Sequence, residues 1–152
     1  MTDLNGKVAY ITGGSKGIGF GVAQSLLNAG LKVAISGRNL GSVKAAARQL
    51  GSEDTVLAIA SDVTKHEDEE NAIKVILDKW GKLDVVLANA GVGHFAPIDE
   101  MTEEQWHNMI NTNLNGVFHT LKASVEALKA SKGYYITLAS LAGTNFFPMG
   151  AG

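Results

Sequence analysis

At 152 residues, the sequence is long enough for one domain with a sizeable core and too short for two domains of ordinary size. Its formal net charge of -2 offers no electrostatic attraction for nucleic acid or for an anionic membrane surface. Cysteine is absent, which excludes disulfides, thiolate metal sites and cysteine nucleophiles. The first apolar run, Val8 to Ile11, is too short for a signal peptide or a membrane span. We therefore expect a cytoplasmic globular protein with neither nucleic acid nor membrane as a partner.

The first expected strand, 7–12, leads directly into a glycine-rich turn and then into a helix over 17–29. In that turn, Gly13 permits a sharp bend and Gly17 allows the backbone to approach a pyrophosphate, while Gly19 allows tight packing of the helix on the strand. The N-terminus of the helix offers free N–H groups to phosphate. A glycine turn between a strand and a helix predicts a dinucleotide site and not an ordinary loop.

The second expected strand, 32–36, precedes a helix over 40–50, and the third strand spans 55–60. An NAD site usually carries an acidic residue about 20 residues beyond the first glycine. The stretch from Ile35 to Asn39 has no carboxylate, and Arg38 can bind a 2′-phosphate with two parallel hydrogen bonds. Lys16 supplies a second cation in the phosphate turn. The sequence therefore favours NADP(H) over NAD(H), although either cation alone is more commonly a solvated surface charge.

The next helix is expected to run from Thr64 to Trp80, because Thr64 with Glu67 has the pattern of a capping box. Its acidic run, Glu67 to Glu70, suits the positive end of a helix dipole, and we interpret it as a solvated helix start. A nearly all-apolar fourth strand is expected over 83–88. Thr102 with Gln105 predicts a second capping box that opens a long helical stretch towards Ala130, before a fifth strand over 134–138.

This alternation of strands and helices with short connections predicts an α/β fold. We expect a Rossmann-type, doubly wound parallel sheet with strand order 3-2-1-4-5 and helices on both faces. Ligands of such sheets bind beyond the carboxyl ends of the strands, and both the glycine-rich turn and Arg38 directly follow a strand.

The spacing Thr-Gly-x-x-x-Gly-Ile-Gly resembles the signature of the short-chain dehydrogenase/reductase family, classical type. Further motifs follow in the order of that family: Asp62-Val63, Ala88-Asn89-Ala90-Gly91 and Asn113-Leu114-Asn115-Gly116-Val117-Phe118. Alanine replaces the first asparagine of the second of these motifs. The resemblance covers nearly the whole chain and implies cofactor contacts from Gly13, Ser15, Lys16, Gly17, Ile18, Gly19, Arg38, Asp62, Val63, Asn89, Ala90 and Gly91.

The resemblance also implies a reaction, the interconversion of a carbonyl and a secondary alcohol with NADP(H). Ser140 matches the serine that hydrogen-bonds the substrate oxygen. Asn113 matches the asparagine of the catalytic group, with Asn111 and Asn115 as competitors by spacing. The Tyr-x-x-x-Lys motif of the family is missing, because neither tyrosine nor lysine follows Ser140 before Gly152. We therefore expect residues 1–152 to be a single dinucleotide-binding domain, incomplete at its C-terminus, with five of the usual seven strands and no turnover on its own.

Other functions and details stay open at this point. A non-catalytic dinucleotide-binding or sensor protein, or an assembly fragment, would use the same fold. The substrate is a small carbonyl or alcohol whose identity is open between a ketoacyl thioester, a sugar or polyol, and a steroid. The family resemblance implies a homodimer or homotetramer for the full-length protein. The four histidines lack the spacing of metal ligands, so no metal is expected.

Overall fold

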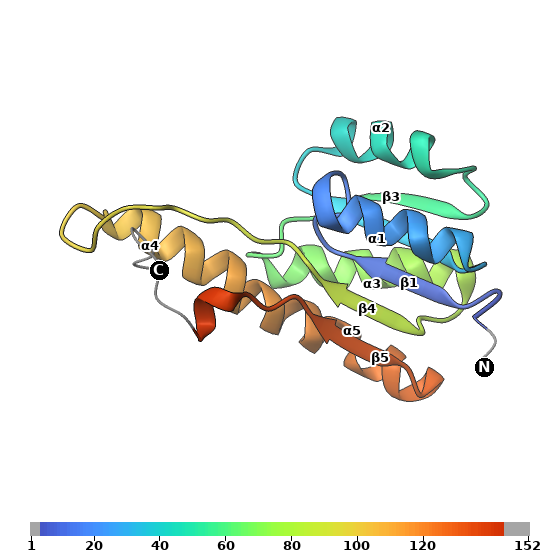
Figure 1. Cartoon of the computed structure of the whole chain (residues 1–152). Helices are drawn as coiled ribbons and strands as arrows, with labels where there is room; N and C mark the ends of the chain where they lie inside the picture. Colours follow the sequence, from blue (N-terminus) through green and yellow to red (C-terminus); the bar gives the residue numbers. More distant parts are fainter. Residues whose placement is uncertain (1–3, 145–152) are drawn as a thin grey trace.

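Five parallel strands form the sheet of the protein, with neighbours in the order β3-β2-β1-β4-β5 (Figure 1). The computed structural model describes residues 4–144. The predicted strand order is confirmed, and the predicted strands shift only slightly at their ends. Their bounds are β1 (Val8–Ile11), β2 (Lys32–Gly37), β3 (Val56–Ala60), β4 (Val85–Ala88) and β5 (Tyr134–Thr137).

Helices cover both faces of this sheet, as the doubly wound prediction requires. On one face lie α1 (Gly17–Asn28) and α2 (Leu40–Leu50), and on the other lie α3 (His66–Trp80) and α5 (Gly116–Ser131). The helix α4 (Glu103–Ile110) lies beyond the carboxyl ends of the strands (Figure 1). It continues through a π-helical turn, η1 (Asn111–Asn115), into α5, and a short 3₁₀ turn, η2 (Leu141–Gly143), follows β5.

The buried side chains of β1 alternate between two cores, one on each face of the sheet. Ala9 and Ile11 pack with the apolar side chains of α1 and α2. Val8 and Tyr10 pack with those of α3 and with Leu128 of α5. Because successive residues of a strand point to opposite faces, a four-residue strand serves both cores.

The start of α3 differs from the prediction. Its N-cap is Lys65, which makes no side-chain cap. The Thr64 hydroxyl and N–H instead donate to Oδ1 of Asp62, at 2.8 and 3.1 Å, so the predicted Thr64–Glu67 capping box is wrong. The second capping box is confirmed: Gln105 N–H donates to Thr102 Oγ1 and Thr102 N–H donates to Gln105 Oε1.

The acidic run at this helix start is not solvated throughout. Glu67 and Glu70 are exposed, but Glu69 is completely buried. Hydroxyl groups from β1 and from the end of β3 donate to its carboxyl group, and this replaces the hydrogen bonds that water would make. The interpretation of the run as a purely solvated helix start is therefore wrong at Glu69.

The long helix expected from Thr102 to Ala130 is interrupted at η1. In this π-helical turn each backbone hydrogen bond spans one residue more than in an α-helix. None of the helices within residues 4–144 has the length and apolar character needed to cross a membrane.

Candidate cofactor site

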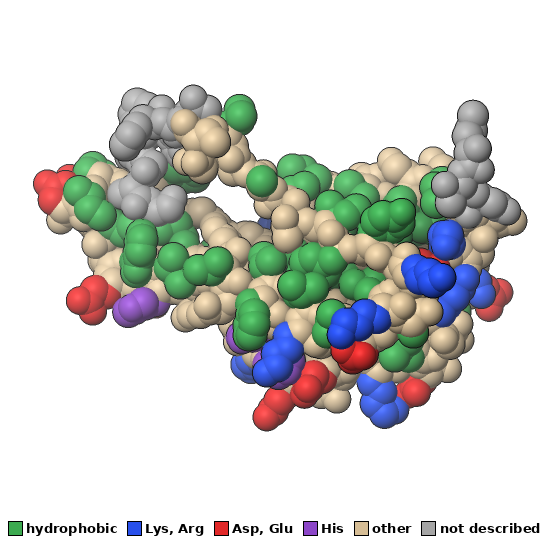
Figure 2. Space-filling model, turned by 90° about the horizontal axis from the view of Figure 1, so that it is seen from below, with side chains coloured by type: hydrophobic (Ala, Val, Ile, Leu, Met, Phe, Trp, Pro, Cys, Tyr) green, Lys and Arg blue, Asp and Glu red, His purple; other side chains and the backbone are tan. Residues whose placement is uncertain are grey.

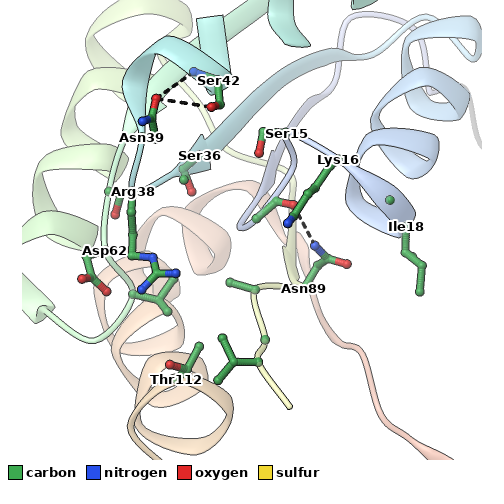
Figure 3. A pocket seen from close by; sticks show the side chains of 18 of the residues that line it. Ser15, Lys16, Ile18, Ser36, Arg38, Asn39, Ser42, Asp62, Asn89 and Thr112 are labelled. Carbon is green, nitrogen blue, oxygen red and sulfur yellow. Dashed lines mark hydrogen bonds between the residues drawn. The ribbon is translucent and has the colours of Figure 1, made fainter. Parts of the chain in front are cut away.

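A cavity of about 580 Å³ opens at the carboxyl ends of the strands (Figure 3). The turn after β1, the ends of β2, β3 and β4, and the π turn η1 all contribute to its wall. The lining residues are Gly13, Ser15, Lys16, Gly17, Ile18, Ser36, Gly37, Arg38, Asn39, Ser42, Ser61, Asp62, Val63, Asn89, Ala90, Gly91, Val92, Thr112 and Leu138. Nearly all of the predicted cofactor residues are thus brought together, and Gly19 lies just behind the wall.

The turn after β1 has the conformation that its glycines permit. Gly13 and Gly17 have φ angles of +67° and +57°, which L side chains rarely adopt. No side chain caps the start of α1, and its first turn contains no acidic residue. The N–H groups and the partial positive charge at this helix start are therefore available to an anion in the cavity.

Gly19 serves packing and not the cavity wall. A Cβ atom added at Gly19 would lie 2.5 Å from Nδ2 of Asn89 and 2.8 Å from the carbonyl oxygen of Gly13. Only glycine therefore lets α1 start this close to the ends of β1 and β4.

Hydrogen bonds join the ends of β1 and β4. The Thr12 hydroxyl accepts from the N–H groups of Asn89 and Ala90, both at 3.0 Å. The Asn89 amide donates to the carbonyl oxygens of Thr12 and Gly13 at 2.9 and 3.2 Å. These bonds hold the floor of the cavity at a fixed distance from the phosphate turn.

Two cations reach the cavity from different strands. Lys16 belongs to the turn after β1 and Arg38 follows β2, and both side chains are exposed (Figure 3). Neither forms an ion pair with any residue between 4 and 144. Next to Arg38, the Asn39 side chain is engaged as the N-cap of α2, where Oδ1 accepts from Ser42 N–H at 2.9 Å.

Asp62 and Val63 are fixed by their neighbours at the end of β3. Asp62 N–H donates to Oδ2 of Asp68 at 3.0 Å, and one oxygen of the Asp62 carboxylate is held by Thr64. The carbonyl oxygen of Val63 lies 2.9 Å from Nδ1 of His119 on α5. A Cβ atom added at Gly116 would lie 2.7 Å from Cγ2 of Val63, so glycine there admits the valine side chain.

Asn113 lies in the π turn and does not line the cavity. Its Oδ1 accepts from Val92 N–H at 2.9 Å and its Nδ2 donates to the Val92 carbonyl at 2.8 Å. This pair of bonds ties η1 to the segment that follows β4. Within residues 4–144, the Asn115 side chain bonds only to Oδ1 of Asn111, in the same helical stretch.

Ser140 also lies outside the cavity lining, two residues beyond Leu138, which does line it. Its Oγ accepts from Ala142 N–H at 3.2 Å at the start of η2, and its side chain is exposed. An acceptor role leaves the hydroxyl proton free to donate to another oxygen.

Several lining residues were not predicted as site residues, notably Ser36, Ser61 and Thr112. Ser36 and Ser61 stand at the carboxyl ends of β2 and β3, so their position on the strand was the signal available in the sequence. Thr112 is brought in by the π turn, which changes the side-chain direction and which the helical periodicity did not reveal. Among the described residues, no group of three or more histidine, aspartate or glutamate side chains could hold a metal ion.

The comparisons with known proteins agree with this geometry. An uncharacterised oxidoreductase of Staphylococcus aureus is 36% identical over 144 residues, and the match covers 94% of this chain and 62% of the relative. An uncharacterised oxidoreductase of Mycobacterium bovis is 33% identical, with coverages of 92% and 57%. The chain thus spans about 60% of the length of these curated relatives.

Solved structures with the same fold include enzymes that bind nicotinamide dinucleotides. An alcohol dehydrogenase from the archaeon Thermococcus sibiricus, in complex with 5-hydroxy-NADP, matches with a TM-score of 0.89 and 38% identity, covering 95% of this chain and 62% of that one. A 3-ketoacyl-(acyl-carrier-protein) reductase from Brucella melitensis, in complex with NADH, matches with a TM-score of 0.91 and 30% identity, covering 97% and 63%. The sequence profile described as short chain dehydrogenase matches residues 7–152. The chain therefore belongs to the short-chain dehydrogenase family of oxidoreductases.

Proposed function

We propose that this chain carries the cofactor-binding part of an NADP(H)-dependent oxidoreductase that interconverts a carbonyl and a secondary alcohol. The observation that carries the choice of cofactor is the pair of cations on the cavity wall, Lys16 and Arg38, which form no ion pair within residues 4–144. No carboxylate follows β2, where one would repel a 2′-phosphate. The related structures hold an NADP analogue in one case and NADH in another, so family membership leaves this choice to the residues present.

Successive segments of the cavity wall match successive parts of a dinucleotide. The uncapped start of α1 with Gly17 and Ile18 receives the diphosphate. Arg38, with Ser15 and Lys16, binds the phosphate on the adenosine ribose, while Asp62 and Val63 contact the adenine. The segment Asn89-Ala90-Gly91 supports the nicotinamide half on the other side of the cavity.

For the reaction, a bound nicotinamide supplies or accepts the hydride. The Ser140 hydroxyl donates a hydrogen bond to the substrate oxygen and so stabilises the charge that develops there. Asn113 acts at a distance, by holding the segment after Gly91 through Val92. We place the full-length protein in the cytoplasm as a homodimer or homotetramer, with a small carbonyl or alcohol as its substrate.

The substitution Arg38→Asp tests the cofactor assignment. Removing one charged, bidentate phosphate contact costs roughly 1.5–3 kcal/mol, so the Kd for NADPH should rise about 10- to 100-fold. The Kd for NADH should fall or stay unchanged, because aspartate can accept from the ribose hydroxyl. Both constants are measured by fluorescence titration of the purified protein.

The matched control is Arg48→Asp, which makes the same change on an exposed part of α2 away from the cavity and should alter neither constant. An unchanged ratio of the two constants in Arg38→Asp would refute the NADP(H) assignment. A wild-type protein that binds neither dinucleotide would refute the proposed function itself.

A further inference from the structure

A cluster of hydroxyl groups surrounds the buried carboxyl group of Glu69. Glu69 itself does not line the cavity, although it lies next to residues that do. The Ser61 hydroxyl donates to Oε1 of Glu69 at 2.5 Å. The Tyr10 hydroxyl lies 3.1 and 3.2 Å from the two carboxyl oxygens, and 2.9 Å from Oγ of Ser36. Tyr10, Ser36 and Glu69 are each 0% exposed. A carboxyl group with these partners links β1, β2, β3 and α3 at one point.

The two serines of this cluster connect it to the cofactor site. Ser61 and Ser36 both line the cavity. Ser61 immediately precedes Asp62, and Ser36 lies two residues before Arg38. Glu69 thus holds the end of β3 directly, and the end of β2 through the Tyr10 hydroxyl.

The Ser61 and Tyr10 hydroxyls both have the carboxyl group of Glu69 as an acceptor. A tyrosine hydroxyl has a single proton, so when it donates to an ionised Glu69 its oxygen is left to accept from Ser36. Protonation of Glu69 introduces a competing donor into a cluster that consists of hydroxyl groups, and the chain of donors must then rearrange. The position of the two serines therefore depends on the charge of Glu69.

Burial raises the pKa of Glu69 above its usual value of 4.5, against the hydrogen bonds from Ser61, Thr120 and Tyr10 that lower it. Asp68, on the same helix, raises it further. The other titratable groups that interact with Glu69 are Tyr10 on β1, whose pKa burial and Glu69 raise well above 10.0, and Tyr135 on β5, whose pKa burial and Glu69 raise to about 12. The raised pKa values keep both tyrosines neutral at ordinary pH, which leaves Glu69 as the acidic group of the hydroxyl cluster.

We propose that Glu69 is a positioning residue of the cofactor site, whose ionised carboxyl group fixes Ser61 and, through Tyr10, Ser36, so that the ends of β2 and β3 present Arg38 and Asp62 to the adenosine half of the dinucleotide. This inference rests on the proposed dinucleotide-binding function. It assigns to a residue of the acidic helix start a role in cofactor affinity and in the dependence of that affinity on pH.

The test compares Glu69→Gln with Glu67→Gln, a control that removes the same charge from an exposed position in the same helical turn. The Kd for NADPH is measured from pH 5 to pH 8 on the purified wild-type protein and on both variants. At pH 8, Glu69→Gln should weaken NADPH binding by about five- to tenfold, because the Ser61 and Tyr10 hydroxyls no longer donate to a charged acceptor. The difference from wild type should shrink as the pH falls, because the wild-type carboxyl group becomes protonated. Glu67→Gln should follow the wild-type profile.

Tyr10→Phe provides a second measurement that leaves the Glu69 charge in place and removes its link to Ser36. It should also weaken NADPH binding, and circular dichroism confirms that each variant is folded. The positioning role would be overturned if Glu69→Gln left the Kd for NADPH unchanged, or raised it by the same factor at every pH. Failure of the wild-type protein to bind NADPH at any pH would instead count against the proposed function.

Discussion

At the scale of single residues, Asp84 shows how one buried carboxylate can join several strands. Its Oδ2 accepts from Val8 N–H at 2.8 Å, and Lys7 Nζ donates to Oδ1 at 3.2 Å. Its backbone N–H donates to the Val8 carbonyl, and its carbonyl oxygen accepts from Tyr134 N–H. The residue thus anchors the starts of β1, β4 and β5, at the opposite end of the strands from the cavity.

Replacing Asp84 with asparagine should destabilise the protein. Burial alone would raise the pKa of Asp84, but the hydrogen bonds from Val8 and Lys7 and the charge of Lys82 outweigh it and lower the pKa below 3.8. The ionised group therefore stabilises the fold above pH 3.8, and this contribution is lost as the pH falls through the lowered pKa. Loss of a buried, charge-assisted acceptor costs about 2 kcal/mol.

Urea unfolding of wild type and Asp84→Asn at pH 7 and at pH 3 measures this effect. The difference in unfolding free energy should be largest at pH 7 and should narrow at pH 3. Asp78→Asn is the control, because the one ion pair of Asp78 among the described residues joins it to Lys74 on the exposed side of α3. Equal destabilisation by the two substitutions at pH 7 would show that the buried contacts of Asp84 stabilise the fold no more than an exposed ion pair does.

At the scale of secondary-structure elements, the π turn between α4 and α5 is the feature that most affects the site. It brings Thr112 to the cavity and directs Asn113 towards the backbone of Val92. A π turn is less favourable than an α-helix and persists where side-chain contacts compensate. The two hydrogen bonds between Asn113 and Val92 supply such contacts.

Replacing Asn113 with alanine should therefore release the segment after β4. The loss of two partly solvated hydrogen bonds is expected to lower the unfolding free energy by about 1–2 kcal/mol. Hydrogen exchange of the amides near Val92 should accelerate, because Val92 N–H loses its acceptor. Asn115→Ala is the matched control, since its side chain bonds only within the helical stretch and should leave Val92 protected. Unchanged protection of Val92 in Asn113→Ala would contradict this role of the side chain.

Elements whose signals are local could be predicted from the sequence, and features set by distant partners could not. The bounds of α2 and the Thr102–Gln105 capping box follow from nearby residues and are confirmed. Thr64 has the same local pattern as Thr102, but Asp62 offers it a closer acceptor. Glu69 is buried because Tyr10, nearly sixty residues earlier, donates to it. The π turn depends on Val92, which precedes it by about twenty residues. Most of the cavity wall could be predicted because strand ends meet at one edge of a parallel sheet.

At the scale of the whole molecule, the two edges of the sheet differ in how they are covered. The β3 edge is flanked by α2 and α3, whereas within residues 4–144 β5 is covered by α5 on one face only. On the open face, Tyr134, Ile136 and Leu138 alternate along the strand and are 71%, 48% and 47% exposed. Apolar side chains are also exposed on η1 and on α5, the helix that covers the other face of β5, namely Leu114, Phe118 and Leu121. Figure 2 shows hydrophobic side chains gathered on this side of the molecule.

Exposed apolar side chains along an edge strand promote association between chains. We expect the purified 152-residue chain to self-associate at micromolar concentration, and Ile136→Lys to weaken the association about tenfold or more, because burying an unpaired charge costs at least ~1–3 kcal/mol. Sedimentation velocity over a range of concentrations measures the change. Leu40→Lys is the control, because it adds the same charge at an exposed position of α2, which packs on β2 and β3 at the other edge of the sheet. If both variants associate as wild type does, the β5 face is not where the chains meet, and the apolar side chains of α5 become the next surface to substitute.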